Sequence, residues 1–341
     1  MKAITSARSP RVGLEIARLS SLNKKPLMTL GLVICLAGLT SGQTKFVKKQ
    51  PVKIGYSVFD LQQPYWQAYT KGVQDACKAA GYQCVVSDQK SNQQAEVSGS
   101  IDLINQGISA LINSPIEPAA LPAVIDKAHQ GNIPVVIGDV GVAGKYDAFI
   151  VSNNEDGGKL AAQYMIEHQK DKSGTKEILV IELHPGAAVG GPRTKGFVDE
   201  IKKHSDYKIV ASLNGNDTVQ GGYQATQNTL SANPNLAGIY ATNDPEAEGA
   251  VQALKAAGKN GVKDVFLVGF NGDPPALELV KQGEMAATIR QDPYGQGKKC
   301  VEVATQFMNN EPVEYSDPAT KSVFFPVKVI DKDNVDQFIQ K

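Results

Sequence analysis

Small polar side chains, with one pair of aromatic rings, follow the predicted strands of this 341-residue sequence. They are Gln63, Tyr65, Trp66, Ser114, Asp139, Ser152, Asn154, Asn243 and Asn271. Amides, hydroxyls and one carboxylate supply many hydrogen-bond donors and acceptors with little net charge. An aromatic ring can pack on the C–H face of a ligand while the Tyr O–H or the Trp N–H keeps a polar partner. The set favours a neutral ligand with several hydroxyl groups, although Tyr65 and Trp66 could equally pack into a core.

An alternation of predicted strands and helices positions these residues. From residue 52 we expect strands over 52–57, 83–87, 108–113 and 133–138, separated by helices over 65–80, 95–106 and 121–130. The pattern restarts with helices over 157–168, 193–204, 221–232 and 246–257, and strands over 177–183, 208–213, 236–241 and 264–270. Such alternation predicts βαβ units, a parallel sheet and helices on both faces. In open sheets of this kind ligands bind beyond the carboxyl ends of the strands, where the polar side chains above lie.

A weak internal repeat divides the alternation into two halves. In the first half one strand ends at Ser114-Pro115 and a later strand ends at Asp139; in the second half Asn243 and Asn271 hold the equivalent places. We therefore predict an α/β protein with two doubly wound parallel-sheet lobes. A single sheet of about ten strands is the alternative, at the upper end of common sheet sizes. Residues 292–320 are expected to rejoin the first half with a helix over 297–308, and 323–329 to form a terminal strand.

The first 42 residues are typical of a secretory signal peptide. Lys24 and Lys25 precede an apolar run over 27–39, and small residues follow at 40–42. The run is shorter than the roughly 20 residues that span a bilayer. An N-terminal membrane anchor is the alternative, because the small residues do not form an A-x-A cleavage site. We expect export to the periplasm.

The charges argue against nucleic acid as a partner. Of 35 basic and 35 acidic residues, six basic and one acidic fall within residues 1–42, so the remainder carries 29 and 34 and a net charge of −5. A mildly acidic body has no electrostatic footprint for DNA.

After cleavage three cysteines remain, of which Cys77 and Cys84 could form a disulfide in an oxidising compartment or stay separate buried thiols.

Motifs of catalysis, nucleotide binding and metal binding are missing from the sequence. There is no glycine-rich phosphate loop, no G-x-S-x-G or H-E-x-x-H, and no Cys/His cluster with ligand spacing. Asp139, Asp217 and Glu246 could act as general acids or bases, but a binding or capping role is favoured for each. We predict no catalytic residue, no cofactor and no metal.

Eight short motifs in order resemble the type I periplasmic binding proteins, and among them the ribose-binding-protein-like sugar binders. They are Gln63-Pro64-Tyr65-Trp66, Ser114-Pro115, Ile137-Gly138-Asp139, Ser152-Asn153-Asn154, Arg193-Thr194-Lys195-Gly196-Phe197, Tyr240-Ala241-Thr242-Asn243-Asp244, Val268-Gly269-Phe270-Asn271-Gly272 and Ala287-Thr288-Ile289-Arg290-Gln291. The resemblance implies two lobes joined by three crossovers, with a sugar bound between them by hinge closure. The domains would be a signal peptide (1–42), an N-terminal lobe (52–152 plus 292–321) and a C-terminal lobe (153–291 plus 322–341).

The resemblance also implies roles for individual residues. Tyr65 and Trp66 match a stacking pair, Asp139 a carboxylate that binds adjacent hydroxyls, and Arg193 a guanidinium that offers a fork of donors. Asn243 and Gln291 match amide ligands, although Asn243 could be a helix cap and Arg193 a surface residue of its helix.

Five positions depart from the ribose-type pattern. Val140 replaces an arginine, Asn271 an aspartate, Gln63 and Ser114 asparagines, and Asp217 an aromatic residue. Relative to the ribose-type pattern the site loses one cation and one anion, so we still expect a neutral ligand. The changed side chains should select a different arrangement of ligand hydroxyls. Ribose is not expected; another pentose, a hexose or a polyol is.

Together these features predict a monomeric solute-binding protein that delivers a small neutral sugar to the membrane permease subunits of an ABC importer. Three alternatives remain. A sensory protein that serves a chemoreceptor or a sensor kinase would have the same kind of sequence. A secreted α/β enzyme is less expected, as is a regulator of the lac-repressor type, since the leader supplies no helix-turn-helix.

Overall fold

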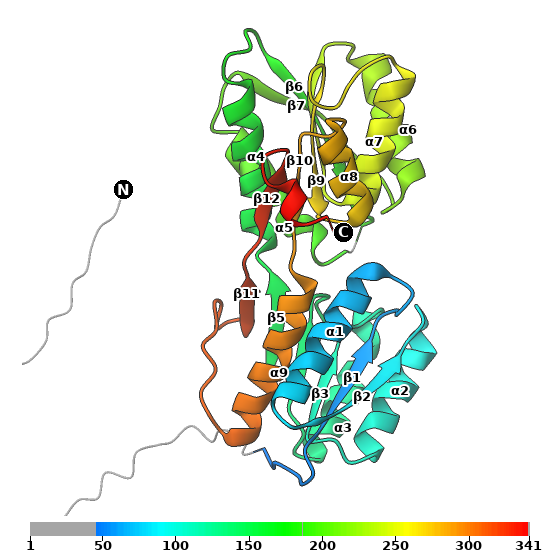
Figure 1. Ribbon diagram of the computed structural model, residues 1–341, viewed down its shortest axis with the longest axis vertical. Coiled ribbons are helices and arrows are strands. Elements are labelled where there is room, and N and C mark those ends of the chain that lie inside the picture. The colour runs from blue at the N-terminus through cyan, green and yellow to red at the C-terminus, as the bar shows by residue number, and fades with distance from the viewer. Residues whose placement is uncertain (1–45, 186, 340–341) are drawn as a thin grey trace, which may run out of the picture. The chain divides into compact units, whose positions relative to one another are not determined.

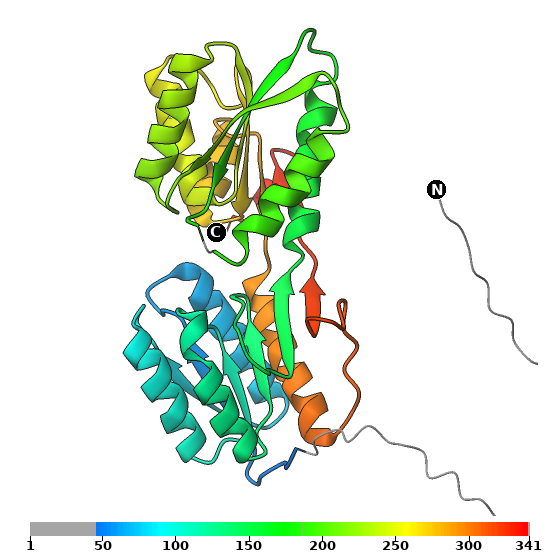
Figure 2. The same ribbon diagram turned by 180° about the vertical axis from the view of Figure 1, so that it is seen from behind.

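The computed structural model describes residues 46–185 and 187–339, so the predicted signal peptide lies outside the described residues. Within this part of the chain twelve strands form two six-stranded sheets (Figures 1 and 2). Helices cover both faces of each sheet, as the alternation predicts. The fold is α/β with two doubly wound sheets rather than one sheet of about ten strands.

The first sheet has the order β11-β5-β4-β3-β1-β2, with every pair parallel. Its strands are β1 (Lys53–Val58), β2 (Gln83–Asp88), β3 (Ala110–Asn113), β4 (Val135–Gly138), β5 (Ala148–Ser152) and β11 (Ser322–Phe325). Helices α1 (Pro64–Ala79) and α9 (Pro293–Asn309) share one apolar cluster with the sheet. On the other face, α2 (Gln93–Asn105) and α3 (Pro122–Gln130) share another, and η1 (Pro118–Ala120) precedes α3.

The second sheet has the order β12-β10-β9-β8-β6-β7, and only β12 in it runs antiparallel. Its strands are β6 (Lys176–Glu182), β7 (Tyr207–Asn214), β8 (Leu236–Ala241), β9 (Phe266–Asn271), β10 (Ala287–Arg290) and β12 (Lys328–Asp331). Helices α4 (Asn154–Gln169) and α5 (Gly190–Ile201) pack on one face. Helices α6 (Val219–Ala232), α7 (Asp244–Ala256) and α8 (Pro274–Gln282) pack on the other, beside η2 (Val335–Gln337).

Strands buried on both faces explain why the sequence reads as short apolar runs. Every residue of β3 and β4 is buried, and so are five of the six residues of β1. Parallel sheets covered on both faces have this near-continuous apolar character. Polar residues therefore mark the points at which each strand leaves the core.

Three crossover segments connect the two sheets. The chain passes from β5 to α4 at residues 152–154, from β10 to α9 at 290–293, and from β11 to β12 at 325–328. Three crossovers are what the resemblance implies.

The last crossover corrects two expectations. The single terminal strand expected over 323–329 is two short strands, one in each sheet. Residues 322–325 therefore belong to the first sheet, whereas the expected boundary assigned them to the second lobe. Pro326 stands between the two strands and lacks the N–H that a ladder needs, so one continuous strand is disfavoured there.

Cys77, at the end of α1, and Cys84, in β2, are free thiols in the structure, so the disulfide considered above is not formed in it. The thiols are nevertheless neighbours, since a hydrogen bond with Cys84 and burial raise the pKa of Cys77. Cys300 is also free and buried in α9. No helix among the described residues is long and apolar enough to span a membrane.

Candidate functional site

Hydrogen bonds join seven of the predicted site residues at the crossover segments into two groups, the Tyr65–Asp139 pair and the other five, and Gln296 links the two groups into one network. The seven are Tyr65, Asp139, Ser152, Asn154, Arg193, Asn271 and Gln291. They come from strand ends and helix starts of both sheets, so residues far apart in the sequence meet in one place. The rule that ligands bind beyond the carboxyl ends of the strands had selected five of them, and only the resemblance had selected Arg193 and Gln291.

Arg193, in the first turn of α5, has the most elaborate surroundings of the seven. It is 3% exposed, which excludes the alternative of a surface residue. Its Nε donates to Oδ1 of Asn154 at 2.8 Å, and Nη1 donates to the carbonyl of Thr242 at 2.8 Å and to Oδ1 of Asn271 at 3.3 Å. The guanidinium carbon lies 3.9 Å from the centre of the Phe270 ring. Among the described residues no acceptor bonds Nη2, which leaves one arm of the fork for a ligand.

Close packing of two helices explains how Arg193 can be buried at this point. A Cβ on Gly158 of α4 would lie 2.0 Å from the carbonyl oxygen of Arg193, and a Cβ on Gly196 would lie 1.9 Å from that of Glu155. Only glycine permits this approach of α4 and α5. Burial lowers the pKa of Arg193 below its usual value, and the charge on Asp139 opposes that shift.

Asp139 supplies the carboxylate of the network. It directly follows β4 with φ of 63°, in the left-handed region that aspartate tolerates better than most residues. The hydroxyl of Tyr65 donates to its Oδ1 at 2.7 Å, and no described residue bonds Oδ2. Burial raises the pKa of Asp139, while the Tyr65 hydrogen bond and the charge of Arg193 lower it. One buried cation and one buried anion thus compensate each other across the site.

Amides complete the network at the crossovers. The hydroxyl of Ser152 donates to Oε1 of Gln291 at 2.7 Å, and Nε2 of Gln291 donates to Oδ1 of Asn271 at 2.9 Å. Asn271 has φ of 136°, a conformation that side chains rarely adopt. The buried carboxyl of Asp244 binds the N–H groups of Gly272 and Asp273, which holds the loop after Asn271 in place.

Gln296 belongs to the network but was missed by the sequence analysis. Its Nε2 contacts the hydroxyl oxygens of Ser152, at 3.1 Å, and Tyr65, at 3.3 Å. It is fully buried in the first turn of α9, and its Oε1 has no partner among the described residues. The only signal in the sequence is its position five residues after Gln291, which does not distinguish it from a surface glutamine.

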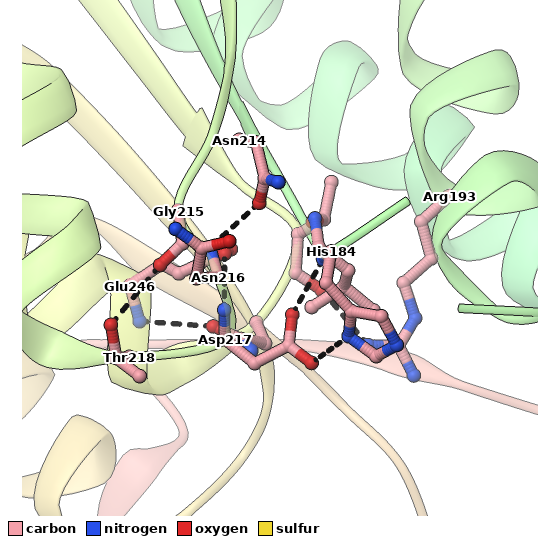
Figure 3. Close-up of polar contacts among 11 residues, drawn as sticks. His184, Arg193, Asn214, Gly215, Asn216, Asp217, Thr218 and Glu246 are labelled. Carbon is pink, nitrogen blue, oxygen red and sulfur yellow. Dashed lines mark hydrogen bonds and ion pairs between the residues drawn. The ribbon is translucent and has the colours of Figure 1, made fainter. Parts of the chain in front are cut away.

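Five predicted residues lie outside this network. Gln63 is exposed before α1, and Trp66 is 5% exposed and stacks on Phe59 within the core of the first sheet. Ser114 is buried with its hydroxyl 3.2 Å from that of Tyr56. Asn243 caps α7 by accepting the N–H of Glu246 at 2.9 Å. Asp217 pairs with His184, a residue that the sequence analysis did not single out (Figure 3).

Two cavities border the crossover segments. One of about 540 Å³ is lined by Ser152 and Asn154 with residues of α4 and α5, and the other of about 670 Å³ by Tyr65, Asn271 and Gln291. Both volumes are typical of small-molecule sites. Within the described part of the chain no group of three His, Cys, Asp or Glu residues could hold a metal ion. The arrangement offers hydrogen bonds from a nearly neutral surface and presents no nucleophile with an activating base.

The chain is similar to characterised binding proteins over most of its length. Residues 54–312 match the family model described as a periplasmic binding protein domain. The ribose import binding protein of Escherichia coli is 32% identical over 300 residues, which cover 87% of this chain and 97% of that protein. The D-allose-binding periplasmic protein of the same organism is 31% identical, over 68% of this chain and 77% of that protein.

Solved structures agree with this similarity. A periplasmic solute-binding protein of an ABC transporter from Actinobacillus succinogenes, determined with bound D-allose, superposes with a TM-score of 0.73 at 27% identity. The alignment covers 84% of this chain and all of that one. A solute-binding protein from Mycobacterium smegmatis with bound glycerol gives a TM-score of 0.72 at 25% identity, over 85% and 97% of the two chains.

Proposed function

This chain belongs to the periplasmic binding protein family, and we propose that it captures a neutral monosaccharide or polyol and delivers it to an ABC importer. The named relatives bind ribose or D-allose, and the two structures contain D-allose or glycerol, all of them uncharged and hydroxylated. The family consists of solute-binding proteins, which accords with a binding role rather than catalysis. Its periplasmic members support export of this chain, with residues 1–42 as the signal peptide.

The observation that carries the proposal is a pair of unused polar groups, one on the buried cation and one on the buried anion of the network. Nη2 of Arg193 and Oδ2 of Asp139 have no partners among the described residues, although both side chains are buried. A sugar hydroxyl both donates and accepts, so it can satisfy the carboxylate oxygen and the guanidinium together. Because the two charges offset each other, a neutral ligand suits the site better than an ion.

The nearby carboxyl groups support the same conclusion. Burial raises the pKa of both Asp244 and Glu246, that of Glu246 to about 8, which favours the neutral form of each carboxyl group. They therefore add little negative charge beside Arg193. An ionic ligand of either sign would meet a like charge in the site, from Arg193 or from Asp139.

We assign ligand-binding roles to the seven network residues and to Gln296, and we keep Trp66, Asn243, Gln63, Ser114 and Asp217 as further candidate site residues. One lobe comprises residues 52–152 with 292–325, and the other comprises residues 153–185 and 187–291 with 328–339. A ligand bound between the lobes favours the state in which both sets of hydrogen bonds form, and the permease subunits would recognise that state. The protein acts as a monomer in this scheme.

Thermal shift across a panel of pentoses, hexoses and polyols tests the proposal. A ligand at 100 times its dissociation constant adds about 2.7 kcal/mol to the stability, which gives a clear rise in melting temperature. We expect at least one neutral sugar to produce that rise and to be recovered chemically unchanged. Folded protein that responds to no sugar or polyol would refute the ligand class.

A further inference from the structure

Asp217 and His184 form a side-chain pair at the carboxyl edge of the second sheet. His184 follows the end of β6 by two residues, and Asp217 lies in the turn between β7 and α6. Oδ1 of Asp217 accepts the backbone N–H of His184 at 2.9 Å, and Oδ2 lies 2.5 Å from Nδ1 of the ring (Figure 3). Two contacts from one carboxylate fix both the backbone and the ring of His184.

The turn that carries Asp217 places two consecutive residues in the left-handed region, which Asn and Asp tolerate better than most residues. Asn216 and Asp217 have φ of 53° and 58°, both in the left-handed region. The N–H of Asn216 bonds Oδ1 of Asn214 at 2.7 Å, and that of Asp217 bonds the buried carboxyl of Glu246 at 3.2 Å (Figure 3). These bonds fix the direction in which the Asp217 carboxylate points toward His184.

The chemistry of the pair leaves one nitrogen available. Nδ1 of His184 faces the Asp217 carboxylate, so Nε2 is the ring nitrogen that remains to bond a ligand hydroxyl. The His184 side chain is 55% exposed, so solutes can reach the ring. The edge of the second sheet therefore presents one ring nitrogen whose direction is set by the contact with Asp217.

Hydrogen bonds connect this pair to the binding network. Leu183, which precedes His184, donates its N–H to the hydroxyl of Thr242 at 3.1 Å. The carbonyl of the same Thr242 accepts Nη1 of Arg193 at 2.8 Å. His184 is thus one residue beyond the segment that anchors the arginine of the site.

We propose that His184 is a specificity-determining residue of the sugar site, and that Asp217 is its positioning residue. Nε2 of His184 accepts a hydrogen bond from one ligand hydroxyl, in addition to those that Asp139 and Arg193 bind. This inference rests on the proposed function and narrows it. The preferred ligand is a sugar or polyol that carries a hydroxyl where it faces the ends of β6 and β7, and the analogue without that hydroxyl binds about tenfold more weakly.

Calorimetric titration of His184→Phe and Asp217→Asn tests this role with the best sugar of the panel and its monodeoxy analogues. Phenylalanine keeps a ring but has no acceptor, and asparagine can no longer accept both contacts as a carboxylate does. We expect His184→Phe to raise the dissociation constant of the best sugar about tenfold and to leave that of one monodeoxy analogue unchanged. Asp217→Asn should weaken binding of the same sugar, and the double variant should show no further loss of affinity. The ¹⁵N spectrum of Asp217→Asn should show that the Nδ1-protonated tautomer of His184 is lost.

His129→Phe is a matched control, because His129 also pairs with an aspartate, Asp147, at 2.8 Å. Asp147 accepts the N–H of Val135 at the start of β4, which is the amino edge of the first sheet. The inference is wrong if His184→Phe binds the sugar and every analogue with dissociation constants within twofold of those of wild type. The proposed function still stands in that case, provided that wild type and His129→Phe bind the sugar. If folded wild type binds no sugar, both are wrong.

Discussion

Arg193→Lys is the substitution whose effect follows most directly from the structure. Lysine keeps the positive charge but replaces a planar fork of five N–H donors by a compact ammonium group. In the native protein Nε and Nη1 make three hydrogen bonds to Asn154, Thr242 and Asn271, and Nη2 is left for the ligand. The ammonium cannot reach all of these acceptors and a ligand from one position, so we expect the ligand contacts to be lost.

The magnitude follows from the two N–H groups of Nη2. A hydrogen bond that involves a charged group contributes about 1.5–3 kcal/mol, so two of them amount to about 3–6 kcal/mol of binding free energy. This corresponds to a dissociation constant roughly 10²–10⁴ times higher. The fold should lose less, about 1–3 kcal/mol, because the ammonium can still donate to some of the three internal acceptors.

Titration calorimetry gives the dissociation constant, and urea unfolding without ligand gives the stability. Lys195→Ala is the control, since Lys195 lies on the same helix but is exposed and pairs with Glu155 and Asp199. It should bind like wild type. Arg193→Lys with a dissociation constant within threefold of wild type would show that Nη2 does not contact the ligand.

Three further outcomes are expected. Asp139→Asn should raise the dissociation constant at least about 100-fold with little change in melting temperature, because it removes the anion that binds hydroxyls; unchanged affinity by calorimetry would contradict this role. Gly158→Ala should lower the stability by about 1–3 kcal/mol and weaken sugar binding, since a Cβ 2.0 Å from the carbonyl oxygen of Arg193 must separate α4 and α5; wild-type melting and affinity would exclude that packing. Burial raises the pKa of Glu246 to about 8, compared with 4.5 when unperturbed. Between pH 4.5 and pH 8 the folded state therefore holds a proton that the unfolded chain releases. The contribution of this proton to the stability falls by about 1.4 kcal/mol per pH unit as the pH rises through that range. Glu246→Gln should therefore gain about 3–4 kcal/mol relative to wild type between pH 5 and pH 8 in urea unfolding, and a constant difference would show that Glu246 is ionised in the folded protein.

The sequence predicts the two-sheet architecture because its strands are short buried runs that end in polar residues. The same rule finds Asp139, Ser152, Asn154 and Asn271, whose positions depend on the strand ends alone. Arg193 and Gln291 were found only through the resemblance, because nothing in the local pattern separates a buried arginine in a first helical turn from an exposed one.

Other features depend on tertiary packing that a linear pattern does not contain. Gln296 is buried because α9 packs against α1, and His184 is oriented by Asp217, 33 residues later in the chain. The sequence over 323–329 is typical of one strand, and only the pairing of β11 and β12 shows that the chain crosses there from the first sheet to the second. The indole of Trp66 shows the same limitation, since the sequence favoured neither core nor ligand and the structure stacks it on Phe59.

Native mass spectrometry of the folded protein tests the central claim most directly. The protein would be incubated with an equimolar mixture of neutral pentoses, hexoses and polyols together with hexuronates and amino acids. We predict one adduct per protein, with the mass of a neutral sugar or polyol, that is missing in Arg193→Lys and retained in Lys195→Ala. Adducts formed only with the charged solutes, or a neutral adduct that persists in Arg193→Lys, would contradict the account.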